Sequence, residues 1–321
     1  MLFRSFSPER RVPGTHARDY LGILPLLWAR ASKPIGAAMR CEGDLYARLW
    51  RPFLLAALNT EPTEAPSGLA AVVIRETLLK GGRASRPLIA REGLSAALID
   101  PALRYLESRG VTVRFEHNLR GIEFGRRRVA ALDFGGEPVR LNYDDAVVLA
   151  VPAVMAKTLI PSLTAPDEFR AIVNAHFGVA PPPDMPPMIG VLNGTVEWIF
   201  SFPGRLSVTI SGADRLLNIP RETLAETIWR EVAKVVGVAD TLPPWQIVRE
   251  RRATFAATPE QNAKRPGTET AWENLVLAGD WTDTGLPATI EGSIRSGERA
   301  ARAIRARASG VAAPAQGEGG S

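Results

Sequence analysis

A short apolar strand that ends in Gly-Asp and leads through a loop into a helix constrains the fold of this chain most strongly. Residues 275–278 (LVLA) predict a buried strand, and Gly279 has no Cβ atom, so its backbone can approach a ligand closely. Asp280 follows at the carboxyl end of the strand, where open α/β sheets bind ligands. A helical pattern begins at Ile290 after Thr289, and the first N–H groups of a helix favour an anion. The segment therefore predicts a ligand site at a strand–loop–helix corner.

A lone Gly-Asp after a strand is more often a structural corner, but the full string GDWTDTGLPATIEGSIRSG is more specific. It resembles the C-terminal FAD signature of the amine oxidase and carotenoid desaturase superfamily. The resemblance implies that Gly279 and Asp280 contact the ribityl–pyrophosphate part of FAD, and that residues 287–290 lie beside the isoalloxazine ring. The candidate cofactor-binding residues in this segment are Gly279, Asp280, Trp281, Pro287, Ala288, Thr289 and Ile290.

Two upstream segments support this resemblance. Residues 113–122 (VRFEHNLRGI) resemble the family strand whose middle residue, here Leu119, meets the adenine. Residues 146–153 (AVVLAVPA) resemble the strand and turn beside the cofactor, which adds Pro152 to the candidates. Either segment alone is equally typical of ordinary core, so each counts only in combination with the C-terminal signature.

Residues 49–62 (LWRPFLLAALNTEP) and 79–95 (LKGGRASRPLIAREGLS) narrow the resemblance to the hydroxysqualene dehydroxylases, the squalene-associated FAD-dependent desaturases of hopanoid synthesis. The resemblance implies an oxidoreductase that removes the hydroxyl of hydroxysqualene to leave squalene. It also implies a polyprenyl or triterpene substrate and squalene-synthase-like partner enzymes. Two alternatives stay open: a carotenoid- or phytoene-type desaturase, and an inactive, truncated remnant that binds a lipid or a protein partner.

The chain departs from the family pattern because it contains no GxGxxG motif. In the family this motif opens a Rossmann βαβ unit whose helix N-terminus binds the FAD pyrophosphate. Judged by family layout and usual domain sizes, the chain starts about a hundred residues late. A gene model that begins at an internal methionine, a truncated copy and a separate upstream chain are the three explanations to test.

The expected fold is mixed α/β (α+β), an amine oxidase- or desaturase-type two-domain fold without the N-terminal Rossmann unit. We expect helices over 17–58, broken at three prolines, with Leu21, Leu24, Leu27 and Trp28 on one face. Further helices are expected over 69–79, capped by Ser67, and over 94–109, 153–159, 224–236 and 290–308. Expected strands cover 111–115, 129–134, 139–141, 146–151, 188–192, 195–200, 206–210, 246–253 and 275–278. The predicted domain segments are 16–84 (substrate-domain helices), 85–153 (FAD domain), 154–245 (substrate domain), 246–308 (FAD domain) and 309–321 (disordered tail).

The net charge of +5 comes from scattered arginines and suits an anionic membrane surface or a phosphate-bearing ligand. An arginine-rich codon bias explains it equally well. Nucleic-acid binding is not expected, because no basic run is interleaved with aromatic residues. One cysteine and three separated histidines argue against a metal site. Without a signal peptide or a long apolar run, we expect a cytoplasmic protein, with peripheral contact at the inner membrane.

No catalytic residue is assigned from the sequence. Asp283 and Glu291 are the carboxyl groups nearest the expected flavin and are weak candidates for protonating a departing hydroxyl. His117 is expected at a surface or strand edge, and Cys41 is expected to be inert. His176 and the aromatic residues could line a tunnel for a polyprenyl chain, although core positions are more typical of them. These aromatic residues are Trp28, Trp50, Trp198, Trp229 and Phe202.

Overall fold

The computed structural model describes residues 9 and 11–308 of the chain, so the predicted disordered tail over 309–321 lies outside the described residues. The chain divides into two compact units. Unit 1 comprises the chain through Arg114 together with Phe169–Pro259, and unit 2 comprises Phe115–Glu168 together with the chain from Glu260 onward. Each unit is therefore built from segments that are distant in the sequence.

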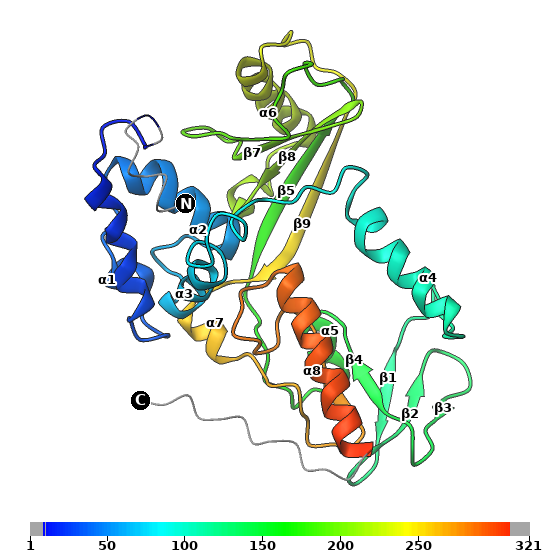
Figure 1. Cartoon of the computed structure of the whole chain (residues 1–321). Coiled ribbons are helices and arrows are strands. Elements are labelled where there is room, and N and C mark those ends of the chain that lie inside the picture. Colours follow the sequence, from blue (N-terminus) through cyan, green and yellow to red (C-terminus); the bar gives the residue numbers. More distant parts are fainter. Residues whose placement is uncertain (1–8, 10, 309–321) are drawn as a thin grey trace. The chain divides into compact units, whose positions relative to one another are not determined.

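Unit 1 contains an antiparallel five-stranded sheet in the order β6-β7-β8-β5-β9. The two long strands β5 and β9 pair along most of their length (Figure 1). Every second residue of β5 from Ala171 to Phe177 is buried. The strands are β5 (Phe169–Phe177), β6 (Met188–Gly190), β7 (Trp198–Phe202), β8 (Arg205–Ile210) and β9 (Trp245–Phe255).

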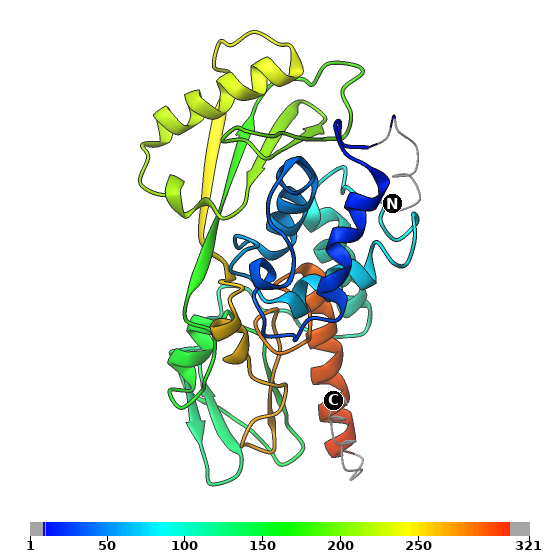
Figure 2. The ribbon, with the colours of Figure 1, turned by 90° about the vertical axis from the view of Figure 1, so that its left-hand side faces the viewer.

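One amphipathic helix, α6 (Arg221–Val236), covers this sheet (Figure 2). Its buried face includes Ile228 and Trp229, and the Trp229 indole packs against the Phe177 ring with 4.9 Å between the ring centroids. The helix ends at Gly237, whose positive φ of 74° suits a glycine C-cap. Burial of these large apolar side chains gives unit 1 its principal core.

The remaining helices of unit 1 are short. The N-terminal one is a 3-10 helix rather than an α-helix, and Tyr20, Ile23 and Leu26 are buried at a spacing of three residues. The predicted face was therefore wrong: Leu21 and Trp28 are exposed. The helices are η3 (Ala17–Leu27), α1 (Ile35–Ala38), η4 (Tyr46–Trp50), α2 (Arg51–Leu58), α3 (Ser67–Glu76), η5 (Ser95–Ile99), α4 (Asp100–Ser108) and η6 (Ala213–Leu216).

The segment that follows α2 attaches these helices to the sheet. Asn59 has a left-handed backbone (φ 49°), and its side-chain amide donates to the Arg170 carbonyl and to Thr254 Oγ1. Thr60 Oγ1 accepts the Ala257 N–H at 2.8 Å. Both residues are buried with their polar atoms bonded, so the NTEP portion of the family-specific motif has a structural role within unit 1.

Unit 2 contains a parallel pair of strands, β4 and β10, and a small antiparallel sheet in the order β1-β2-β3. Asn274 joins them, because its side-chain amide exchanges two hydrogen bonds with the backbone of Val129. The elements are β1 (Gly121–Phe124), β2 (Val129–Asp133), β3 (Val139–Arg140), β4 (Val147–Leu149), α5 (Ala153–Leu159), β10 (Leu275–Leu277) and α8 (Ile290–Ala308), with α7 (Pro259–Ala263) at the boundary between the units.

Three local predictions were wrong, and two elements were missed. Residues 111–115 form no strand, and β5 and α7 were not predicted. The continuously apolar run over 146–151 (AVVLAV) predicts a strand buried on both faces, but Val148 in β4 is 44% exposed. Ser67 does not cap α3: it is the first residue of that helix, and its buried Oγ has no hydrogen-bond partner among the described residues.

Candidate active site

The turn after β10 requires glycine at position 279. Gly279 has a φ of 140°, and a Cβ atom built on it would lie 2.5 Å from Nε1 of Trp281. Its N–H donates to Ser296 Oγ at 2.8 Å, which ties the turn to helix α8. The preceding Ala278 N–H donates to the Leu149 carbonyl at 3.0 Å and continues the pairing of β10 with β4. The backbone is thus held where only a residue without a side chain fits.

Trp281 connects the turn to the other predicted flavin segment. Its buried indole donates from Nε1 to the Val151 carbonyl at 2.8 Å, immediately before Pro152. The structure therefore brings Gly279, Trp281 and Pro152 together. Leu119 is not part of these contacts: it lies half-buried in the stretch that precedes β1.

Asp280 has the electrostatic environment of a functional carboxylate. Burial raises the pKa of its carboxyl group, and the positive charge of Arg265 partly opposes that rise. A half-buried carboxylate at this position can accept hydrogen bonds from hydroxyl groups of a ligand.

The predicted ring-side residues form the N-terminus of α8. Thr289 Oγ1 accepts the Gly292 N–H at 3.1 Å, and the Thr289 carbonyl accepts the Ser293 N–H at 2.9 Å. The amides of Ile290 and Glu291 donate to no group among the described residues. An added Cβ on Gly292 would lie 2.9 Å from the Pro287 carbonyl oxygen, so Pro287, Ala288 and Thr289 pass close over the helix. The two free amides could hydrogen-bond an anionic group.

Helical spacing predicts an inward face of α8 formed by Ile290, Ile294, Gly297, Ala301 and Ile304, but the structure turns a different face inward. Ile290 and Ile294 are each 49% exposed, whereas Gly292, Ser296 and Ala300 are buried. Gly297 and Ala301 are also exposed, so of the predicted inward residues only Ile304 packs against the core. Small residues face inward because the helix lies close to the loop that precedes it.

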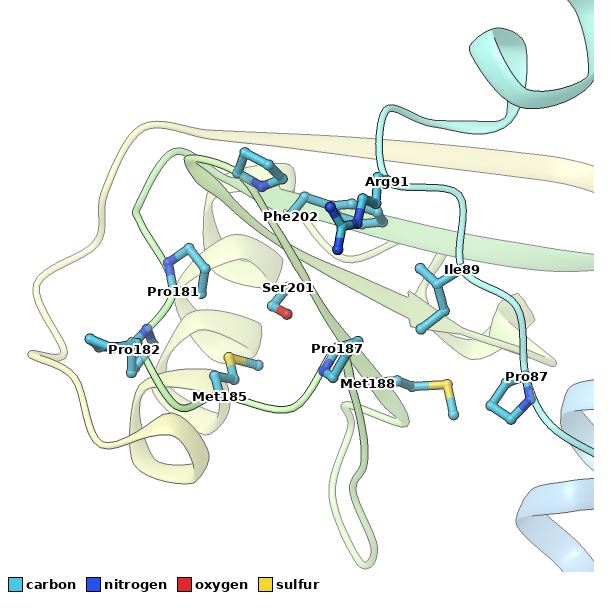
Figure 3. A pocket seen from close by; sticks show the side chains of 12 residues that line it. Pro87, Ile89, Arg91, Pro181, Pro182, Met185, Pro187, Met188, Ser201 and Phe202 are labelled. Atoms are coloured by element: carbon cyan, nitrogen blue, oxygen red, sulfur yellow. The ribbon is translucent and has the colours of Figure 1, made fainter.

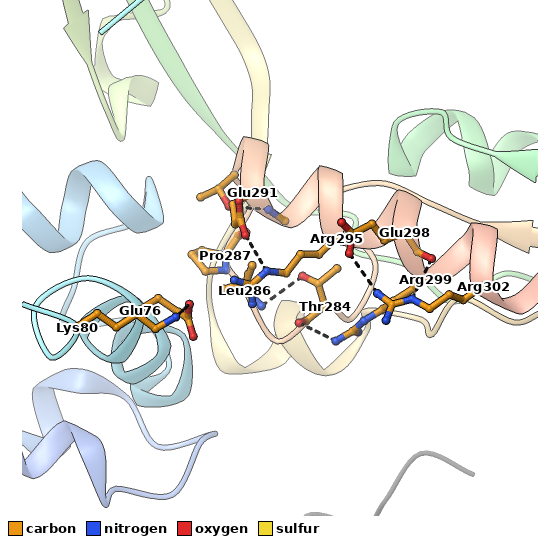
Figure 4. A network of polar contacts seen from close by, with 12 residues as sticks. Glu76, Lys80, Thr284, Leu286, Pro287, Glu291, Arg295, Glu298, Arg299 and Arg302 are labelled. Carbon is orange, nitrogen blue, oxygen red and sulfur yellow. Dashed lines mark hydrogen bonds and ion pairs between the residues drawn. The ribbon is translucent and has the colours of Figure 1, made fainter. Parts of the chain in front are cut away.

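Two arginines hold that loop and were not recognised in the sequence. Arg299 on α8 donates to the Asp283 carbonyl. It also donates to the Thr284 carbonyl (Figure 4). Arg265 is buried and donates to the backbone of Asp280 and Thr282. Ser296, which accepts from Gly279, could have been found by its helical spacing from Gly292. No sequence pattern marks Arg265, because its acceptors in the loop lie far from it along the chain.

Unit 1 has an apolar cavity of about 670 Å³ (Figure 3). Pro87, Ile89 and Arg91 come from the family-specific stretch 79–95, and Phe202 is one of the aromatic residues suggested for a tunnel. The remaining lining residues are Pro181, Pro182, Pro183, Met185, Pro187, Met188, Ser201 and Pro203. This composition suits a hydrocarbon ligand.

The structure also shows where several other residues considered in the sequence analysis lie. Trp229 is core, Trp50 packs edge-on against Tyr20, and Trp28 is 77% exposed. His176 Nδ1 lies 2.9 Å from Ser207 Oγ on the neighbouring strand β8, and burial lowers the pKa of its imidazole. Burial raises the pKa of the Cys41 thiol, as expected for an unreactive cysteine.

The carboxyl groups suggested as proton donors are exposed. Asp283 accepts the Gly285 N–H at 3.2 Å, and Glu291 forms an exposed ion pair with Arg295. Within residues 9 and 11–308, no three His, Cys, Asp or Glu side chains are grouped to bind a metal ion. No helix in the described part of the chain is long and apolar enough to cross a bilayer.

Most of the chain matches one family. The model for flavin containing amine oxidoreductases matches residues 15–305, and the chain belongs to this family. Among solved structures, an oxidoreductase from Methanosarcina mazei superposes with a TM-score of 0.67 at 14% identity, covering 89% of this chain and 71% of that one. Cyclohexylamine oxidase from Brevibacterium oxydans gives 0.65 at 15% identity, covering 91% and 72%. These matches confirm the mixed α/β amine oxidase-type fold.

Curated relatives define the subgroup more narrowly. The chain is 61% identical over 302 residues to the hydroxysqualene dehydroxylase of Rhodopseudomonas palustris, covering 94% of this chain and 72% of that protein. It is 57% identical over 296 residues to the hydroxysqualene dehydroxylase of Sinorhizobium fredii, covering 92% and 71%. The predicted kinship with hydroxysqualene dehydroxylases is therefore confirmed.

Proposed function

We propose that this chain is an FAD-dependent oxidoreductase that removes the hydroxyl group of hydroxysqualene to give squalene. The observation that carries the proposal is 61% identity to a hydroxysqualene dehydroxylase across 94% of the chain. The aligned region of 302 residues is long enough to include both family-specific stretches and the flavin signature, so the proposed reaction class rests on more than the fold. Squalene places the activity in triterpene and hopanoid synthesis.

The fit of unit 2 to a flavin rests on its turn and helix start. The backbone at Gly279 leaves no room for a side chain, and the Asp280 carboxylate is available to accept hydrogen bonds from ribityl hydroxyls. The amides of Ile290 and Glu291 would stabilise negative charge on the reduced ring. The proposed flavin-binding residues are Leu119, Pro152, Gly279, Asp280, Trp281, Pro287, Ala288, Thr289 and Ile290. Of the predicted FAD-domain segments 85–153 and 246–308, we propose that the parts in unit 2, residues 115–153 and 260–308, belong to the flavin-binding part.

Replacing C–OH by C–H consumes a hydride and a proton and releases water. Bound FAD, in its reduced form, supplies the hydride. The protein must orient an apolar chain and exclude bulk water around an ionising C–O bond. We propose that the 670 Å³ cavity of unit 1 holds part of this chain, because its lining is mostly proline, methionine, isoleucine and phenylalanine.

The substrate also suggests where the protein works. A triterpene alcohol partitions into membranes, so we propose peripheral contact with the cytoplasmic face of the inner membrane, which the arginine-rich surface would favour. Squalene-synthase-like enzymes are the proposed partners, since their chemistry would supply hydroxysqualene.

The test is to saturate the purified chain with FAD, reduce it anaerobically and add hydroxysqualene in detergent. We expect squalene, measured by gas chromatography with mass spectrometry, in proportion to bound flavin, and none from Gly279→Ala. Dehydrogenation of phytoene without squalene formation would instead indicate a carotenoid-type desaturase. A colourless chain whose melting temperature is unchanged by FAD would indicate a remnant without flavin function.

A further inference from the structure

Arg265 is a buried arginine whose guanidinium group forms several hydrogen bonds with one loop. It is 7% exposed and follows α7 in unit 2. Its Nη2 lies 3.2 Å from the Asp280 carbonyl oxygen, 2.5 Å from the Thr282 carbonyl oxygen and 3.3 Å from Thr284 Oγ1. One side-chain nitrogen therefore contacts three residues of the turn that begins at the proposed flavin carboxylate.

The backbone beside Arg265 reinforces this arrangement. The Pro266 carbonyl accepts the Asp283 N–H at 2.7 Å, and Nη1 of Arg265 donates to Asn262 Oδ1 at 3.1 Å. Residues 262–266 thus hold residues 280–284 in position through side-chain and backbone hydrogen bonds. Arg299 contacts the same loop from helix α8, but its side chain is exposed.

Burying a charged group costs desolvation free energy, so a buried arginine is an inefficient way to stabilise a loop. Burial lowers the pKa of Arg265 to about 10, which still leaves the guanidinium charged at neutral pH. Its guanidinium group donates hydrogen bonds to carbonyl, amide and hydroxyl oxygens, and the negative charges of the nearby Asp283 and Asp280 carboxylates favour its charged form. A buried cation of this kind is weak support for stability, so its use points to a role in fixing conformation.

We propose that Arg265 is a positioning residue for the flavin: it holds residues 280–284 in the conformation that presents Asp280 to the cofactor. The guanidinium fork suits this role because it bonds several acceptors in fixed directions, whereas a lysine ammonium bonds as a point charge. The proposal rests on flavin binding by this turn, as proposed above.

The experiment compares Arg265→Lys and Arg265→Met with Arg302→Lys, a control on the same unit whose guanidinium forms only exposed contacts with Glu298. Hydrogen exchange of peptides over 279–286 is measured without FAD, and FAD affinity and the visible flavin spectrum are measured by titration. We expect faster exchange confined to this turn in both Arg265 variants, at least about tenfold weaker FAD binding and an altered flavin spectrum. Arg302→Lys should behave as the parent.

Three outcomes overturn the proposal. One is unchanged exchange in Arg265→Lys, which retains the charge and should still fold. Another is faster exchange spread evenly over unit 2, which would indicate a general structural role. The third is an unchanged FAD affinity when the parent binds FAD. If the parent itself binds no FAD, the proposed function fails, but the exchange measurement still decides whether Arg265 orders the turn.

Discussion

The core of unit 1 and the flavin turn of unit 2 are held by different forces. Around Phe177, the sheet and α6 bury large apolar side chains with almost no exposed area. In the turn from Gly279 to Thr284, the conformation depends on polar contacts from Ser296, Arg265 and Arg299. Apolar burial stabilises the fold without a preferred direction, whereas directional hydrogen bonds select one backbone conformation. We therefore expect substitutions in the two regions to affect different measurements.

The largest effect on stability should come from Phe177→Ala. Phe177 is fully buried against Trp229, and truncation of a buried phenylalanine typically reduces the free energy of unfolding by about 3–5 kcal/mol. Denaturant unfolding measures the change. Phe115→Ala is the control, because Phe115 is 74% exposed and its loss should change stability by less than about 0.5 kcal/mol. Equal effects from the two substitutions would contradict the assignment of the core.

Gly279→Ala should have the opposite effect to Phe177→Ala, with a large loss of FAD binding and no change in the stability of unit 1. The alanine must adopt a φ of 140° and meet the Trp281 indole, so the turn shifts and FAD binding is lost. Unfolding of unit 1 should be unchanged, which separates this variant from Phe177→Ala.

Gly285→Ala is the matched control for Gly279→Ala. Gly285 has a positive φ of 74°, but an added Cβ there has no atom within 4 Å. It should therefore weaken FAD binding less than Gly279→Ala, because it introduces backbone strain without a collision. Equal losses would mean that strain alone, and not the approach of Trp281, sets the requirement for glycine.

Trp281→Phe should have a smaller effect. The substitution keeps an apolar ring but removes the donor to the partly buried Val151 carbonyl. We expect a loss of about 1–3 kcal/mol in the stability of unit 2, with partial weakening of FAD binding. Hydrogen exchange near residue 151 measures the loss directly. Unchanged protection there would show that the indole N–H does not stabilise the link.

The same contrast explains how much of the structure the sequence could predict. Helix α8, strand β10 and the need for Gly279 follow from contiguous residues, and the prediction located them correctly. Strand β5 was missed because its partners β8 and β9 lie far along the chain and its inward positions include small alanines. Arg265 was missed because its acceptors in the turn lie 15–19 residues later. Local patterns predict elements, but long-range polar contacts require the fold.

The inward face of α8 shows a further limit. Hydrophobicity favours Ile290 and Ile294 as buried residues, yet the helix turns Gly292, Ser296 and Ala300 inward. Gly292 leaves no space for a Cβ against Pro287, so backbone proximity overrides side-chain hydrophobicity there. The same close approach forms the proposed flavin site, so the prediction of the face fails at the place where the structure departs from a simple amphipathic helix.

The smallest expected effect concerns pH and Asp280. Burial raises the pKa of this carboxyl group above its ordinary value of 3.8. A carboxyl group with a raised pKa contributes stability below its ordinary pKa, and loses that contribution as the pH rises through the raised value. At neutral pH the buried charge therefore destabilises unit 2, and Asp280→Asn should slightly raise its melting temperature. The gain should disappear as the pH approaches 3.8.

The same variant should bind FAD about tenfold more weakly, because an amide is a poorer acceptor for hydroxyl groups than a carboxylate. A variant that gains stability without losing affinity would show that the charge of Asp280 does not serve the cofactor.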